Sequence, residues 1–170
     1  MIIASALPIA GFVGCVLTAA ISDARTLRIP NVLCAAMAAL FVAHAAIDLT
    51  AGETLGALAL AGATLVVGFM AFARGKIGGG DVKLLTVCMA WAGPNHAAEF
   101  LVVTGLAGGV IAAALLSPRL VRATIGLQRH WPLSTTVSTR ADAAPTRAPM
   151  PYGVAIAAGA LVVAARIVAA

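Results

Sequence analysis

Long apolar segments recur along nearly the whole chain, separated by short polar or glycine-rich stretches. A helix needs about 20 apolar residues to cross roughly 30 Å of hydrocarbon, and several segments approach that length. The alternating pattern of a transmembrane strand is absent, because the apolar residues run continuously. The sequence therefore predicts an all-α, polytopic integral membrane bundle of about six helices. The predicted spans are Ile2 to Ile21, Val32 to Leu49, Thr54 to Ala73, Val82 to Gly93, Ala97 to Ser117 and Tyr152 to Val168.

Composition supports a membrane protein made of one domain. Of the 170 residues, 62% are hydrophobic and only 10% are charged, whereas about a quarter of a soluble domain is charged. One membrane-embedded domain over residues 1–170 is therefore predicted. Its single extended polar segment, residues 118–149, is expected to be a cytoplasmic loop whose arginines contact anionic lipid, with substrate binding as the alternative.

Nearly all basic residues fall on one side of this helix map, with Arg166 alone near the other. The positive-inside rule makes the basic side cytoplasmic and leaves both chain ends outside. The net charge of +5 is thus explained by topology and the lipid bilayer, and no nucleic-acid partner is expected. The residues on the basic side are Arg25, Arg28, Arg74, Lys76, Lys83, Arg119, Arg122, Arg129, Arg140 and Arg147.

Among the groups able to do chemistry, two aspartates at the ends of apolar segments share the basic side, and Asp142 lies on that side within the polar loop. Asp23 and Asp81 each lie where an apolar segment meets a basic stretch. His44 and His96 fall on the opposite side, so a catalytic triad that joined them to these acids would have to cross the bilayer. His130 is on the basic side, but it stands in the polar loop without a matching nucleophile motif. The cysteines lack Cys-x-x-Cys spacing and are expected to be buried thiols, with no metal or cofactor site: Cys15, Cys34 and Cys88.

Each aspartate also has a purely structural interpretation. Asp81 follows Gly78 to Gly80, so it could cap a new helix; the glycines could equally let a peptide backbone pass close to its carboxylate. Asp23 could mark the end of a helix before Pro30. The fourth span is short, and one hypothesis is that residues 77–81 enter membrane depth as irregular backbone.

Two carboxylates on one membrane face nevertheless indicate acid/base chemistry. In peptide hydrolysis by an aspartyl mechanism, one acid acts as base toward water and the other as acid toward the carbonyl. Such a pair shares a proton and titrates as a unit. Asp23 and Asp81 are therefore the candidate catalytic pair.

Three segments carry a resemblance to a known family. Asp23-Ala-Arg-Thr-Leu-Arg-Ile-Pro-Asn31, Gly78-Gly79-Gly80-Asp81-Val-Lys-Leu84 and Pro151-Tyr152-Gly153-Val-Ala-Ile-Ala157 resemble the type IV prepilin peptidases, in their short form associated with Flp-type pili. The resemblance implies a membrane aspartyl endopeptidase of the bacterial inner membrane. Its active site would face the cytoplasm and remove the basic leader from prepilins and pseudopilins.

The resemblance also assigns residues. It implies Asp23 and Asp81 as catalytic acids, with Gly78, Gly80, Lys83 and the Pro151-Tyr152-Gly153 motif in support. Long family members carry an insert with two Cys-x-x-Cys pairs and also N-methylate the new pilin terminus; this chain has neither the insert nor the pairs, so only peptidase activity is carried over. The oligomeric state is not predicted.

Two other classes of protein compete with this interpretation. A small transporter or proton channel also places acids near a membrane core, but near its midplane and with internal repeats, neither of which is present. In the other class, an assembly or scaffold protein without catalytic activity, Asp23 and Asp81 would serve topology only.

Overall fold

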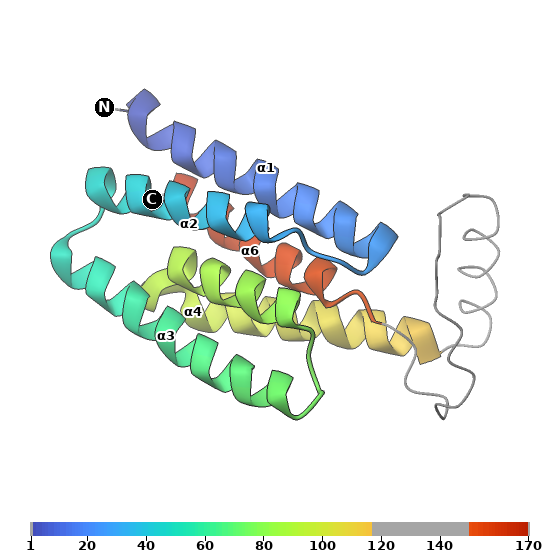
Figure 1. Cartoon of the computed structure of the whole chain (residues 1–170). Helices are drawn as coiled ribbons and strands as arrows, with labels where there is room; N and C mark the ends of the chain where they lie inside the picture. Colours follow the sequence, from blue (N-terminus) through green and yellow to red (C-terminus); the bar gives the residue numbers. More distant parts are fainter. Residues whose placement is uncertain (1, 117–149, 170) are drawn as a thin grey trace.

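The computed structural model describes residues 2–116 and 150–169, which form helices joined by short turns (Figure 1). Each helix is long and apolar enough to cross a membrane. The predicted all-α fold is confirmed, and the protein is a multi-pass membrane protein. The predicted loop over residues 118–149 lies outside the described residues. The helices are α1 (Ile2–Thr26), α2 (Asn31–Asp48), α3 (Ala51–Ala73), α4 (Gly79–Leu116) and α6 (Tyr152–Ala169).

Helix α4 contains the fourth and fifth predicted spans. Its backbone leaves the helical region at Gly93, with φ 56° and ψ −173°, and Pro94 follows. The two halves fold back against each other at this point (Figure 1). The prediction of about six spans is therefore consistent with five helices, one of which turns.

The start of α4 differs from the prediction. The helix begins at Gly79 rather than Val82, and the Val82 amide donates to the Gly78 carbonyl at 3.1 Å. The hypothesis of irregular backbone is therefore wrong for residues 79–81. Helix α1 likewise continues to Thr26 rather than ending at Ile21.

The core lies between α1, α2, α4 and α6. Helix α6 packs against both α1 and α4, whereas α3 packs mainly against α4 and leaves most of its surface exposed. Trp91 organises one part of this core: its ring stacks on Phe12 with centroids 4.3 Å apart, and its Nε1 donates to the Met37 carbonyl at 3.1 Å. Burial of such a ring contributes strongly to stability.

The helix ends gather at two ends of the bundle. One end holds the C-terminus of α1 and the N-terminus of α6, with the turns from α1 to α2 and from α3 to α4; we call it the Asp23 end. The other holds the α2–α3 turn and the bend in α4; we call it the Gly93 end (Figure 1). Within the described residues the basic side chains follow the predicted sorting, because Arg28 and Lys76 belong to the Asp23 end and Arg166 to the Gly93 end. The five other arginines of the predicted basic side lie outside the described residues: Arg119, Arg122, Arg129, Arg140 and Arg147.

Replacing Gly93 tests the bend in α4. Its backbone conformation is open almost exclusively to glycine, so we expect Gly93→Ala to destabilise the fold by about 1–3 kcal/mol. The thermal unfolding temperature in detergent measures this effect. Gly62→Ala is the matched control, since nothing lies within 4 Å of a Cβ built there and α3 is helical. An equal loss in both variants would contradict a special role for Gly93.

Candidate active site

Asp23 lies in the last turn of α1 and is almost fully buried, with 4% of its surface exposed. The amide of Gly153, in the first turn of α6, donates to Asp23 Oδ2 at 2.7 Å. A buried carboxylate is costly unless it is hydrogen-bonded, and the N-terminus of a helix supplies amide donors and a favourable dipole. The structure thus provides a dedicated partner for this acid.

Asp81 lies in the first turn of α4 and is half-buried. Because the helix begins at Gly79, Asp81 is inside the first turn rather than at the capping position before it. The prediction that it might cap the helix is therefore wrong in position. The backbone of Gly78 hydrogen-bonds to its carboxylate, which holds the side chain against the helix start.

The two acids line one cavity. Its volume is about 330 Å³, and Asp23 is close enough to Asp81 for the two charges to interact. Two acids separated by 58 positions in the chain are thereby brought to one site, as the sequence analysis expected. The other lining residues are Leu27, Arg28, Ile29, Asn31, Gly78, Gly79 and Gly80.

The three glycines before Asp81 lie close to other side chains of the protein. A Cβ at Gly78 would stand 2.8 Å from Asp81 Oδ2, and one at Gly80 would stand 3.3 Å from the Cβ of Ile29. At Gly79 the nearest atom belongs to Phe72, also at 3.3 Å. The groups that come close to these glycines are thus side chains of the protein itself: Asp81, Phe72 and Ile29.

The Pro151-Tyr152-Gly153 motif forms the turn into α6. Gly153 is buried, and a Cβ there would stand 2.8 Å from Asp23 Oδ2 and 2.9 Å from its Cγ. Tyr152 is 40% exposed and Pro151 is half-buried; neither lines the acid cavity. Gly153 is therefore the member of the motif that contacts a candidate catalytic acid.

Lys83 does not line the acid cavity, but it hydrogen-bonds to Asn31, a residue that does. Its Nζ donates to Asn31 Oδ1 at 3.0 Å, which joins the start of α4 to the start of α2. Asn31 lines the cavity, as does Arg28. Both lie in the segment that carries the resemblance, but the sequence analysis gave neither a role at the acid pair.

The cysteines and the two described histidines do not line the acid cavity. Cys15, Cys34 and Cys88 are unpaired thiols; the last two are buried and Cys15 is half-buried. His44 and His96 belong to the Gly93 end. Within residues 2–116 and 150–169, no three His, Cys, Asp or Glu side chains gather to hold a metal ion.

Comparison with known proteins adds the family. The sequence profile of the type IV leader peptidase family matches residues 10–113, which is more than half of the chain. The chain belongs to the type IV leader peptidase family. Comparisons with curated proteins and with solved structures found no match. Membership of this leader peptidase family supports a peptidase, and the matched region contains both Asp23 and Asp81.

Gly153→Ala tests the support of Asp23. The new methyl group would collide with the Asp23 carboxylate, and a displacement of about 1 Å at a catalytic group reduces rates up to about 100-fold. We therefore expect leader-peptide cleavage to fall at least about tenfold. Gly14→Ala in α1 is the control, because nothing lies within 4 Å of its Cβ. Unchanged cleavage by a folded Gly153→Ala protein would contradict this support.

Proposed function

We propose that this leader peptidase is an aspartyl endopeptidase that removes the basic leader from type IV prepilins and pseudopilins of the Flp type. The observation that carries the proposal is the cavity that Asp23 and Asp81 share. Two carboxylates at one site can supply both the general base and the general acid for hydrolysis of a peptide without a covalent intermediate.

The environments of the two acids support different starting roles. An amide N–H donating to a carboxylate stabilises its ionised form, and Asp23 receives such a bond at 2.7 Å while being almost fully buried. The backbone of Gly78 hydrogen-bonds to Asp81 as well, and two neighbouring carboxylates resist simultaneous ionisation, so the pair shares one proton. We assign the role of base to Asp23, which the short bond from Gly153 holds in place, and the role of acid to Asp81.

Hydrolysis then proceeds in two steps. Asp23 takes a proton from water as the water oxygen bonds to the scissile carbonyl carbon, and Asp81 donates its proton to the carbonyl oxygen. In the second step the carbon–nitrogen bond breaks, the leaving nitrogen takes the proton from Asp23, and the hydroxyl proton returns to Asp81. Both carboxyl groups regain their starting protonation states, and the reaction consumes only water.

The site's position supports cleavage at a membrane surface. The acid cavity lies at the Asp23 end, where Arg28, Lys76 and Lys83 are also found. By the positive-inside rule that end faces the cytoplasm of a bacterial inner membrane. Prepilin leaders would be presented there, while the apolar helix that follows each leader stays in the bilayer.

Removing either acid tests the mechanism. Asp23→Asn and Asp81→Asn keep the side-chain shape but abolish proton transfer, which contributes about 100-fold to 10,000-fold. We expect each variant to lose prepilin cleavage by at least about 100-fold, measured as the mass shift of the pilin in membranes that contain the purified protein. The double variant should be no slower than either single variant, because the two acids act as a unit.

Glu99→Gln is the matched control, since Glu99 pairs with Arg166 at the Gly93 end and takes no part in the acid cavity. Its cleavage should equal that of the natural protein. Normal cleavage by a membrane-inserted Asp23→Asn or Asp81→Asn protein would refute the aspartyl mechanism and favour a structural role for the acids.

A further inference from the structure

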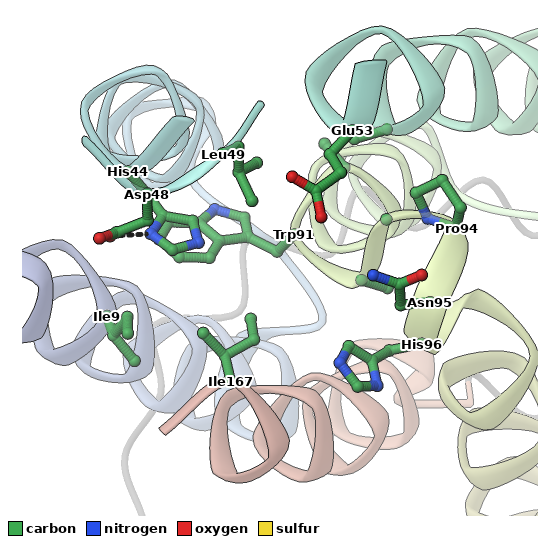
Figure 2. Close-up of a pocket in the computed structure, with 14 residues that line it drawn as sticks. Ile9, His44, Asp48, Leu49, Glu53, Trp91, Pro94, Asn95, His96 and Ile167 are labelled. Carbon is green, nitrogen blue, oxygen red and sulfur yellow. Dashed lines mark hydrogen bonds and ion pairs between the residues drawn. The ribbon is translucent and has the colours of Figure 1, made fainter. Parts of the chain in front are cut away.

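A second cavity lies at the Gly93 end, opposite the acid pair (Figure 2). Its volume is about 340 Å³. The end of α2, the start of α3, the bend in α4 and the end of α6 supply its walls. The proposed peptidase reaction uses none of these residues, so the cavity requires an explanation of its own.

One wall of this cavity is held rigidly. His44 is 5% exposed, and its Nδ1 lies 2.9 Å from Asp48 Oδ2. Its ring stacks on Trp91 with centroids 5.1 Å apart and planes inclined by only 6°, and Phe12 covers the other side of Trp91. Because Nδ1 faces Asp48, the opposite edge of the imidazole, with Nε2, is turned toward the cavity (Figure 2).

The facing wall presents a carboxylate. Glu53 Oε2 accepts hydrogen bonds from the Thr50 amide at 2.9 Å and from its hydroxyl at 2.7 Å. These contacts fix the side chain at the start of α3, and its carboxylate points into the cavity, with the Asn95 amide below it (Figure 2). A carboxylate and an imidazole nitrogen therefore face the cavity from α3 and α2, with the Asn95 side chain between α3 and His96.

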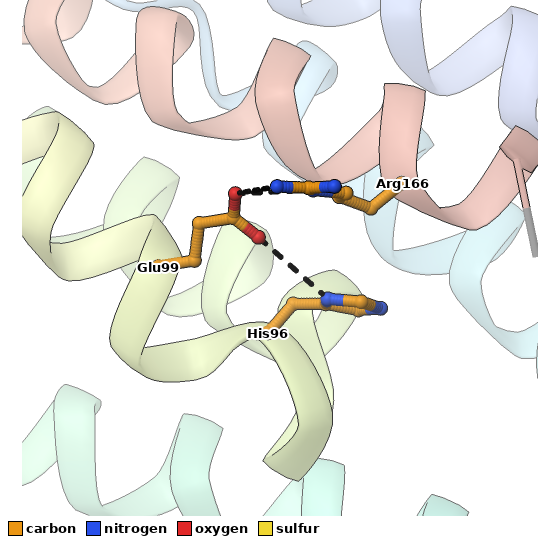
Figure 3. Close-up of polar contacts among 3 residues, drawn as sticks. All are labelled: His96, Glu99 and Arg166. Atoms are coloured by element: carbon orange, nitrogen blue, oxygen red, sulfur yellow. Dashed lines mark hydrogen bonds and ion pairs between the residues drawn. The ribbon is translucent and has the colours of Figure 1, made fainter.

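The nearest guanidinium is already neutralised. Arg166 donates through Nε and its terminal nitrogen to Glu99 Oε1, at 3.1 and 2.9 Å, and His96 Nδ1 lies 3.9 Å from Glu99 Oε2 (Figure 3). Arg166 does not line the cavity. This network therefore orients His96 at the cavity wall without giving the cavity a positive charge.

The charge and shape of the cavity define its ligand. Asp48 and Glu53 are acidic, and none of the described residues that line the cavity is lysine or arginine. Apolar surface from Leu49, Pro94 and Ile167 completes the walls. A volume near 340 Å³ exceeds the roughly 30 Å³ of one water many times over, so it accommodates a small organic group.

From these contacts we infer that the cavity at the Gly93 end binds a primary ammonium group carried on a short apolar stem. Glu53 is its ion-pair partner, and Nε2 of His44 accepts a further N–H hydrogen bond. The helix ends lie where lipid headgroups meet water, so two sources share this chemistry: the ethanolamine headgroup of a lipid and a free amine. The inference is independent of the peptidase mechanism.

Fluorescence of Trp91 reports binding, because its ring stacks directly on His44. Trp131→Phe removes the second tryptophan, which lies outside the described residues. The full chain in phosphatidylcholine vesicles is titrated with phosphatidylethanolamine or with free ethanolamine. We expect a saturable change in Trp91 emission and a higher unfolding temperature, whereas phosphatidylcholine alone, whose headgroup has no N–H donor, produces neither.

Two variants test whether ammonium binding takes place in the cavity at the Gly93 end. Glu53→Gln removes the charge but keeps a side chain suited to the capping box with Thr50, so the helix start is preserved. We expect it to weaken ammonium binding at least about tenfold. Gly62→Ala, in the same helix as Glu53, adds a methyl group where nothing lies within 4 Å and should bind normally.

The outcomes distinguish a lipid headgroup from a free amine as the ligand, and they show whether the cavity binds an ammonium group. A response to phosphatidylethanolamine alone identifies a lipid site; an equal response to free ethanolamine identifies a small-molecule site. Equal binding by natural protein and Glu53→Gln, a response to inorganic phosphate instead of ethanolamine, or no response to either amine would overturn the inference. Running the titration in the Asp81→Asn background keeps the result separate from peptidase activity.

Discussion

The hydrogen bond from the Gly153 amide to Asp23 joins residues 130 positions apart in the chain, and the rest of the site depends on it. It holds the first turn of α6 against the last turn of α1. Because α6 also packs against α4, the same contact helps to set where α4 begins relative to α1. A carboxylate this deeply buried is stable only with a donor in place, so site geometry and helix packing constrain each other.

The fold follows largely from the apolar segments, whereas the helix boundaries do not. Continuous apolar runs predicted the six helical segments, including the two halves of α4. The fourth predicted span began at Val82, after the three glycines and Asp81, whereas the helix begins at Gly79. In the folded protein, Gly79 lies close to Phe72 and Gly80 close to Ile29, side chains from two other segments of the chain. Tertiary contacts between separate segments cannot be read from local propensity.

The candidate site was likewise predicted only in part from the sequence. Asp23 and Asp81 were identified from their position beside basic stretches and from the family resemblance, and the structure brings them to one cavity. The contact between Gly153 and Asp23 could not be foreseen, since it depends on how α6 docks on α1. The cavity at the Gly93 end was also missed. Sorting by membrane side placed His44, Glu53 and His96 together, but no spacing rule indicated that they surround a common space.

The packed interior between the two cavities helps to distinguish a peptidase from a transporter. A transporter must connect a central site to each face in turn, and it builds that site near the midplane. Here the middle of the bundle is filled by apolar side chains such as Phe12, Met37 and Cys88, each at most 1% exposed. Asp23 and Asp81 lie at one end of this core, and the His44–Trp91 stack lies toward the other. A site that opens at a single face suits hydrolysis of a chain presented from that side, because the substrate enters and both products leave without crossing the core.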